Sequence, residues 1–271
     1  MTTSFTATLL GFATEVARLS IWLVLLAALF VPVERLFALR PQKILRPSIA
    51  ADLGYYFLSS LLPGFVISIP LATLAALAHA VVPFEVQDTV EALPLWARMA
   101  AGLLVGELGA YWGHRWSHQI PFLWRFHEVH HTPGHLDWLV NTRAHPVDMV
   151  FTRLCALTPL YVLGLGGPPG TSGSLVPAIV LIVGAAWGFF VHANVRWRFG
   201  PLEWFVATPA FHHWHHTLEG PINNNYAAML PFLDRLFGTH HLPRQSWPAE
   251  YGVLPNTAPP STPAPSTVRF S

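Results

Sequence analysis

Long apolar runs dominate the chain, and their lengths predict membrane helices. Residues 19–33 carry no charge and, with their apolar flanks, approach the roughly 20 residues that a spanning helix needs. The other apolar runs cover residues 53–84, 93–112, 149–165 and 175–191. The run 53–84 is too long for one upright helix and contains Pro63 and Pro70, so it predicts one pass with a surface turn, or a re-entrant hairpin. The pattern predicts an all-α, multi-pass membrane bundle with five spans, or four as the alternative.

The distribution of charge predicts the orientation of this bundle. Five spans place the acidic loop formed by Glu85, Asp88 and Glu91 on one side and most basic residues on the other. Those basic residues are Arg35, Arg40, Lys43, Arg46, Arg115, Arg125, Arg143, Arg196, Arg198, Arg235 and Arg244. The positive-inside rule makes the basic side cytoplasmic. The histidine-rich motifs fall on that side, just past the third and fifth predicted spans, so we expect a cytosolic helical cap that carries the site.

Composition narrows the class of protein further. The 271 residues are 52% hydrophobic and 11% charged, which is too apolar for a soluble domain of this length. The formal net charge of +1 indicates neither a nucleic-acid partner nor an acidic one. The single cysteine, Cys155, excludes an internal disulfide and an iron–sulfur cluster ligated by cysteines of this chain. No glycine-rich nucleotide motif is present, so reducing equivalents for any redox reaction must come from another molecule.

Histidine is the residue type that stands out, with fifteen copies in a chain that has one lysine. His114 and His118 have i, i+4 spacing on a predicted continuation of the third span, so both imidazoles lie on one helical face. Glu107 and Tyr111 fall on the same stripe. We therefore expect this carboxylate and phenol to orient a ligand histidine through its other ring nitrogen.

Three further histidine clusters follow along the chain. They are His127, His130 and His131; His192, at the end of the fifth apolar run; and His212, His215 and His216. Nine imidazoles near a low-dielectric boundary would be costly to desolvate without partners, and metal ions accept the lone pair of each. Nine ligands exceed what one zinc ion uses, so the count predicts two metals, with iron, zinc, copper and nickel all compatible. His79, His240 and His241 are interpreted as ordinary polar residues and left out.

Two other classes of protein remain as alternatives. The sequence from His127 to His131 also satisfies HExxH, in which Glu128 would be the general base of an intramembrane zinc metalloprotease. That reading leaves most of the other histidines without a role. A membrane metal-transport or haem-binding protein is the second alternative, but transport sites usually lie near the membrane midplane rather than beyond the helix ends.

The order and spacing of these boxes resemble the fatty acid hydroxylase/sterol desaturase superfamily of integral-membrane di-iron enzymes. The resemblance runs from about residue 93 to 238 and includes the stretches RAHPVD (143–148), NNNYA (223–227) and DRLFGT (234–239). It implies two non-haem iron ions, O2 as co-substrate and an external electron donor of the cytochrome b5 or ferredoxin kind. The implied substrate is a fatty acyl chain, a sterol or another lipid, whose C–H bond is hydroxylated or desaturated. The chemistry takes place at the metals, so no single catalytic side chain is predicted.

Two positions depart from the pattern of that superfamily. Gly188 stands where hydroxylase relatives have a second histidine before His192, and Ala227 stands where many members have glycine. The first departure leaves one metal position to be completed by water, by Asn194 or by His145. The predicted organisation is N-terminal transmembrane helices over residues 1–90, a catalytic domain over 91–252, and a disordered tail rich in Pro, Ser and Thr over 253–271.

Overall fold

A computed structural model describes residues 5–167 and 172–254. The named secondary-structure elements in these residues are all helices. The α-helices are α1 (Phe5–Leu36), α2 (Ile49–Val66), α3 (Ser68–Val81), α4 (Phe84–Glu91), α5 (Leu95–Gln119), α6 (Pro121–His131), α7 (Pro146–Val162), α8 (Leu175–His192), α9 (Pro209–His215) and α10 (Phe232–Leu236). The 3-10 helices are η1 (Trp138–Thr142), η2 (Ser172–Ser174) and η3 (Gly200–Trp204). The predicted all-α fold is confirmed, while most of the predicted tail lies outside the described residues.

Fewer helices than predicted are long and apolar enough to cross a membrane. Within the described residues, α1 and α8 meet that test, and α3 with α4 makes a third only if the pair counts as one broken span or re-entrant loop. The helices of this pair are bent by 108° at Val82 and Pro83. Arg98 and Glu107 interrupt the apolar run of α5, and α7 has 17 residues, so neither helix is among them. The structure thus supports two or three spans by length and composition, and the predicted count of five, or four, stays a prediction.

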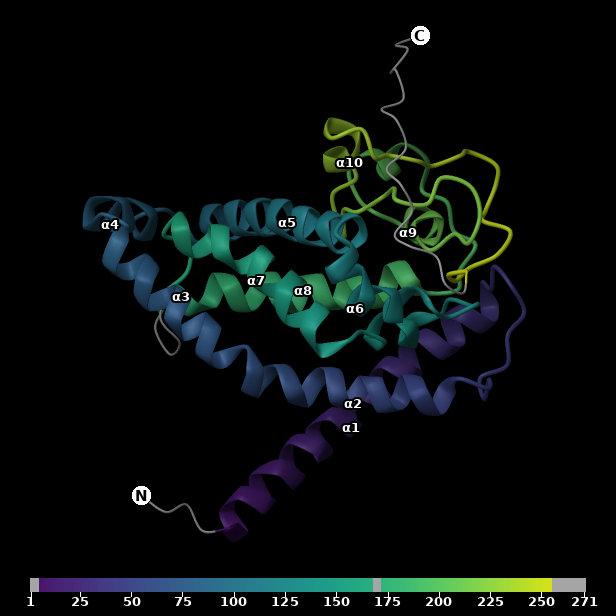
Figure 1. Cartoon of the computed structure of the whole chain (residues 1–271), viewed down its shortest axis with the longest axis horizontal. Helices are drawn as coiled ribbons and strands as arrows, with labels where there is room; N and C mark the ends of the chain where they lie inside the picture. Colours follow the sequence, from purple (N-terminus) through teal and green to yellow (C-terminus); the bar gives the residue numbers. More distant parts are fainter. Residues whose placement is uncertain (1–4, 168–171, 255–271) are drawn as a thin grey trace.

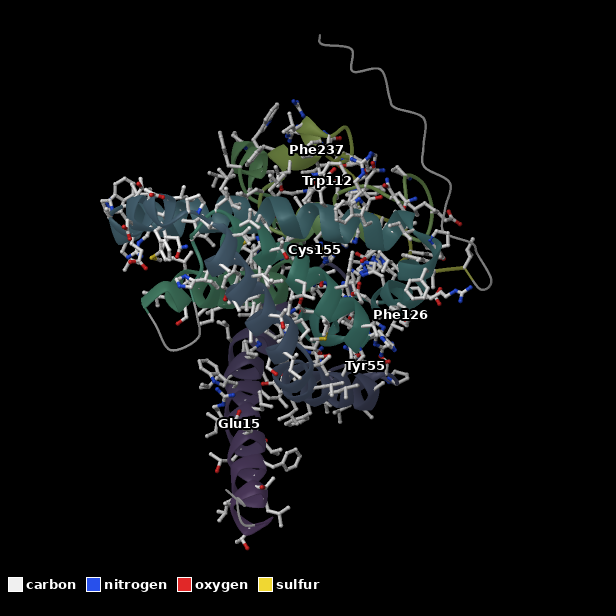
Figure 2. All side chains as sticks on the ribbon, turned by 60° about the vertical axis from the view of Figure 1, so that its left-hand side comes forward. Glu15, Tyr55, Trp112, Phe126, Cys155 and Phe237 are labelled. Atoms are coloured by element: carbon white, nitrogen blue, oxygen red, sulfur yellow. The ribbon has the colours of Figure 1, made fainter. Side chains whose placement is uncertain are left out.

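The central helices pack through small residues and aliphatic side chains. In Figure 1, α5, α7 and α8 run side by side, with α2 and α3 along one flank. A Cβ atom added at Gly113 of α5 would lie 2.7 Å from the Cβ of Cys155 on α7, so glycine permits this close approach. Cys155 is thus a packing residue of this contact, and it lies in the middle of the bundle in Figure 2. Leu157 and Val180 are among the residues of the core that α3, α7 and α8 share.

The C-terminal half of the N-terminal helix packs against the other helices, whereas its N-terminal half projects away from them. Figure 1 shows α1 running away from the other helices toward the N-terminus, and Figure 2 shows Glu15 on this projecting part. Its C-terminal half contributes Phe30 to a core with Trp138 and Ala193. The chain that follows pairs Ala38 with Val195 in an isolated β-bridge. These contacts join α1 to the loop that follows α8.

The two ends of the bundle are covered by different elements. In Figure 1, α4 lies at one end, while α9, α10 and the loops between residues 193 and 254 cover the other. The C-terminal ends of α5, α6 and α8 point into that covered end. Its side chains are polar as well as apolar, and buried residues there include Asn225, Asp234 and most of the histidines.

Candidate metal centre

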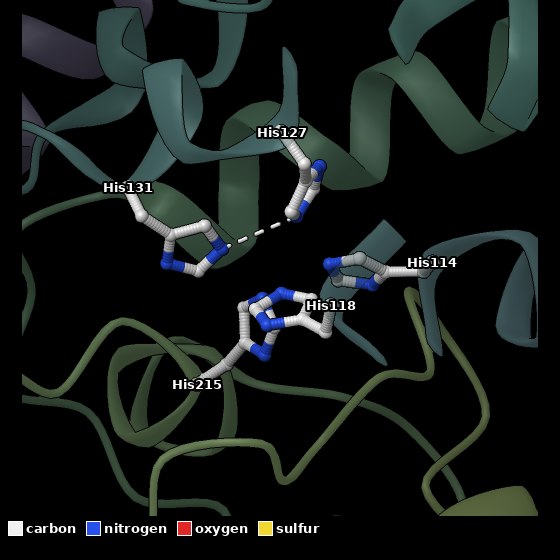
Figure 3. A group of neighbouring side chains, drawn as sticks. All are labelled: His114, His118, His127, His131 and His215. Atoms are coloured by element: carbon white, nitrogen blue, oxygen red, sulfur yellow. Dashed lines mark hydrogen bonds between the residues drawn. The ribbon is translucent and has the colours of Figure 1, made fainter. Parts of the chain in front are cut away.

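The nine histidines predicted as ligands gather in two groups. In each group, one ring nitrogen of every member lies within 4.8 Å of those of the others. The first group is His114, His118, His127, His131 and His215, and the second is His130, His192, His212 and His216. Figure 3 shows the five rings of the first group turned toward a common space from α5, α6 and α9. The structure thus brings together all nine side chains that the sequence singled out.

Each histidine triplet is divided between the two groups. On α6, His127 and His131 have i, i+4 spacing and join the first group, whereas His130 joins the second. The triplet that begins on α9 has the opposite arrangement, because His215 alone joins the first group. The i, i+4 partners point the same way from a helix, and the residue between them is rotated toward the other group. Helices α6 and α9 therefore form a wall that both groups share.

Backbone carbonyl oxygens orient several of the rings. The Nδ1–H groups of His114, His130, His192 and His215 donate to the carbonyl oxygens of Tyr226 (2.7 Å), Arg143 (3.0 Å), Gly188 (2.7 Å) and Asn224 (2.8 Å), respectively. A carbonyl oxygen can only accept, so each of these rings carries its proton on Nδ1. Each ring therefore presents the lone pair of Nε2 to the interior of its group, which is the atom a metal would bind.

The facing nitrogen atoms make these groups suitable for cations. The Nε2 atoms of His130 and His192 are 3.1 Å apart, and those of His192 and His212 are 3.0 Å apart. Because His130 and His192 both hold their proton on Nδ1, no proton lies between their Nε2 lone pairs, and the contact is repulsive unless a cation lies nearby. Ligand atoms about 2.0 to 2.1 Å from one metal ion lie roughly 3 Å from each other, which agrees with these separations.

The first group provides a second test of this fit. The Nε2 atoms of His118 and His215 are buried and, within the part of the chain that the structure describes, have no hydrogen-bond partner. Buried polar atoms without partners are uncommon and call for an explanation such as a bound ion. The nitrogen donors of both groups thus fit divalent transition metals.

Burial favours the neutral form of several histidines of the site. Desolvation, followed by the electrostatic effect of the nearby His127 ring, lowers the pKa of His130 from 6.5 to about 4. Desolvation likewise places the pKa values of His131 and His216 well below the ordinary value. Neutral imidazoles have a free lone pair, so proton release is not required before these rings bind a metal.

Asp148 is a ligand-orienting residue that the sequence analysis missed. Its Oδ2 atom lies 3.0 Å from Nδ1 of His127, and its Oδ1 atom accepts a hydrogen bond from Ser117 at 3.1 Å. Burial alone would raise the pKa of Asp148, but the charge and hydrogen bond of His127 lower it overall, which favours the carboxylate. The stretch RAHPVD contains Asp148, so the signal was present in the sequence, but helix packing was needed to bring it to His127.

We predict that Asp148→Asn weakens metal binding by about 10- to 100-fold, as is typical when the hydrogen-bond partner of a metal-ligating histidine is replaced. Asparagine has nearly the same shape, so the fold should be retained. The measurement is metal content after dialysis against graded chelator. Glu128→Gln, on the same helix as His127 but outside both groups, is the matched control and should bind as the parent does. Equal metal retention by both variants would exclude this role for Asp148.

The predicted partners Glu107 and Tyr111 hydrogen-bond groups other than the histidine rings. The Oε1 atom of Glu107 accepts hydrogen bonds from the backbone N–H groups of Met229 (2.5 Å) and Leu230 (3.0 Å). The Tyr111 hydroxyl lies 2.8 Å from the hydroxyl of Thr239. These hydrogen bonds do not involve a histidine ring, so the expectation that Glu107 or Tyr111 orients a ligand histidine directly was wrong; the Tyr226 carbonyl oxygen is the partner of His114 Nδ1. Both residues pack around the segment whose Tyr226 carbonyl orients His114.

Asn194 and His145, the two residues considered for the incomplete metal position, have other roles. Both amide atoms of Asn194 bond the backbone of Arg40, with Oδ1 accepting at 3.1 Å and Nδ2 donating at 2.7 Å. The Nδ1 atom of His145 accepts from the backbone N–H of Val147 and caps α7, and its ring packs against Phe126. The hypothesis that either of them completes the metal position is corrected by these contacts.

His213 lies between ligand candidates in sequence but faces another way. Its Nδ1 atom lies 2.8 Å from the Tyr251 hydroxyl and its Nε2 atom lies 3.1 Å from the carbonyl oxygen of Ala193. Desolvation lowers the pKa of His213 to about 3. It belongs to neither group and instead ties α9 to the C-terminal loop and the residue after α8.

The described residues therefore form a helical bundle with a histidine-rich candidate dimetal centre at one end. The chain belongs to the fatty acid hydroxylase family, whose sequence model matches residues 99–239. That range holds all nine histidines of the two groups.

Several similar proteins are named as lipid hydroxylases or monooxygenases. Ornithine lipid hydroxylase OlsE from Rhizobium tropici is 34% identical over 198 residues, which are 70% of this chain and 56% of that protein. Alkylglycerol monooxygenase from Homo sapiens is 31% identical over 177 residues, 65% of this chain and 36% of that protein. Methylsterol monooxygenase 2-2 from Arabidopsis thaliana is 25% identical over 158 residues, 54% of this chain and 55% of that protein. The chain thus spans 56% or less of the length of each of these relatives. No solved structure matches it.

Proposed function

We propose that this protein is a membrane-bound, non-haem di-iron enzyme that uses O2 to hydroxylate a C–H bond of a lipid. The observation that carries the proposal is the two groups of histidines, in which ring nitrogen atoms face one another. Some of these Nε2 atoms have no hydrogen-bond partner among the described residues, and others lie 3.0 to 3.2 Å from the Nε2 atom of a neighbouring histidine. The family match and the names of the relatives supply the reaction class, since they are hydroxylases and monooxygenases of lipids.

Each group is proposed to hold one iron ion. When bound, iron supplies the redox chemistry that activates O2. Hydroxylation converts one C–H bond and O2, with two electrons and two protons, into a C–OH group and water. The single cysteine excludes a redox disulfide within the chain, so the two electrons are assigned to an external donor of the cytochrome b5 or ferredoxin kind.

A cavity beside the first group supports an alkyl carbon as the site of reaction. It has a volume of about 120 Å³ and is lined by His118, His131 and His215 together with Trp124, Leu218, Ile222 and other residues. An apolar cavity of about 150 Å³ holds one benzene molecule, so this space suits a short stretch of alkyl chain rather than a whole lipid. The chain's own task is to place that stretch beside the metals and keep it away from water.

The membrane location is supported by the exposed apolar surface of two helices. Ile21, Trp22 and Val24 of α1 expose more than half of their surface, and Ile182 of α8 exposes 68%. Such a surface is costly in water and stable in lipid. The distribution of arginine favours a cytoplasmic position for the metal centre, which the electron donor then reaches from the cytosol.

Metal analysis combined with lipid analysis tests the proposal. Protein purified in detergent or nanodiscs should contain about two non-haem irons per chain, and cells that express it should accumulate a lipid heavier by one oxygen atom, labelled when 18O2 is supplied. One zinc with proteolytic activity would support the HExxH alternative, a Soret band would support a haem protein, and a lipid lighter by two hydrogens would indicate desaturation. Each of these three results contradicts the proposal as stated.

Filling the cavity should reduce turnover without removing the metals. Ile222→Trp places a large ring in the apolar part of the cavity, and we expect turnover to fall by more than tenfold while iron content is unchanged. Ile182→Trp is the matched control, because Ile182 is exposed on α8 and should tolerate the same change. Normal turnover by Ile222→Trp would remove the assignment of this cavity to the substrate.

A further inference from the structure

The second histidine group has one imidazole fewer than the first, and the position of the missing one can be identified. The first group has five imidazoles and the second has four. Gly188 lies four residues before His192 on α8, so both residues are on the same helical face. Hydroxylases that this chain resembles have a histidine at that position. A fifth imidazole of the second group would therefore arise from residue 188.

The side chain of Asn141 occupies the space that a residue at position 188 would use. A Cβ atom added to Gly188 would lie 2.5 Å from Oδ1 of Asn141 and 3.1 Å from its Cγ and Nδ2 atoms. The 2.5 Å contact is shorter than real Cβ atoms make, so a side chain at position 188 would require the Asn141 amide to shift. The Asn141 amide thus lies in space that a histidine at position 188 would need.

Asn141 is flanked by the groups that orient two rings of the second group. The carbonyl oxygen of Arg143, two residues along the chain, accepts from Nδ1 of His130. The carbonyl oxygen of Gly188 accepts from Nδ1 of His192, and the Asn141 amide lies where a Cβ of residue 188 would be. Asn141 is therefore close in sequence to one of these supporting residues and close in space to the other.

The helix that presents Asn141 is held firmly in place. Asn141 belongs to η1, which packs against α8, and Asp137 caps η1 by accepting from the backbone N–H groups of Leu139 and Val140. Trp138 and Leu139 anchor the same helix in the core that contains Phe30. A side chain on such a support has a defined direction, as a metal-binding residue requires.

We propose that Asn141 completes the second metal position in place of the missing histidine, with its amide oxygen binding the ion or a water molecule held on it. This inference rests on the proposed di-iron function. A neutral amide oxygen is a weaker donor for iron than imidazole nitrogen. The second iron should consequently be the more readily exchanged of the two.

Iron stoichiometry and exchange test this proposal without relying on activity. Asn141→Ala should lower iron from about two toward one per chain, or accelerate the chelator-driven release of the second iron by tenfold or more. Asn141→Asp keeps an oxygen donor and should retain two irons. The double variant Asn141→Gly with Gly188→His restores the imidazole and should also retain two, with slower release than in the parent.

The outcomes separate this inference from the function on which it rests. A parent protein with fewer than two irons contradicts the di-iron function itself. A parent with two irons, together with an Asn141→Ala variant that releases both at the parental rate, overturns the role of Asn141 alone. If Asn141→Ala does not fold, the double variant decides: retention of two irons supports the proposal, and loss of the second iron overturns it.

Discussion

His131→Ala is expected to abolish turnover and to lower metal affinity by at least about a hundredfold, the upper range seen when only the hydrogen-bond partner of a ligand is replaced. The ring of His131 borders both groups. Its centre lies 4.7 Å from the rings of His118 and His215 in the first group and 4.3 Å from the ring of His216 in the second. Iron per chain, measured on purified protein, is the direct readout.

His241→Ala is the matched control for this variant. The ring of His241 packs on Trp214 and belongs to neither group, so iron content and turnover should equal those of the parent. The backbone N–H of His241 donates to Oδ1 of Asn225, and this hydrogen bond survives the substitution. Equal iron content in His131→Ala and His241→Ala would contradict the assignment of the first group.

Asp52→Ala is expected to cause the largest loss of stability, because it breaks a buried network of charges. Asp52 is fully buried, pairs with Arg46, and accepts from Nε of Arg143 at 2.5 Å. Arg46 also pairs with Asp137, the cap of η1. Removing one partner from a buried pair costs about 3 to 5 kcal/mol because the remaining charge lacks compensation.

Thermal unfolding of the detergent-solubilised protein measures this effect, and a decrease in Tm of roughly 10 °C is expected for a chain of this size. Since the carbonyl oxygen of Arg143 orients His130, the second iron should also be held more weakly. Glu15→Ala is the control, because Glu15 pairs with Arg18 at an exposed site and its loss should cost less than about 1 kcal/mol. Similar Tm values for the two variants would show that the buried network does not stabilise the fold.

The local geometry of the histidine boxes was predictable because helical periodicity is a property of neighbouring residues. The i, i+4 and i, i+3, i+4 spacings place imidazoles on one side of a helix wherever that helix lies. The helices that carry His114 and His127, and the helix end at His192, are present as expected. The concentration of histidine in an apolar chain singled out the nine side chains that the structure brings into two groups.

The span count stays a prediction, because apolar runs in this chain can serve two purposes. A hydrophobic segment is needed both to face lipid and to pack against other helices, and sequence alone does not separate the two. The segment 149–165 became α7, which packs Leu157 and Leu160 into the core. The segment 53–84 became parts of two helices, α2 and α3, and the chain bends sharply after α3.

The sequence by itself determined the helical class, the membrane character and the identity of the nine histidines, since these follow from composition and from spacing within single helices. Only the tertiary structure decided how the triplets divide between two groups, that Asp148 orients His127, and that Asn141 fills the space beside Gly188. These contacts join residues from different helices, and their geometry depends on how closely the helices approach. That approach is set by the packing of the whole bundle, which no short stretch of sequence encodes.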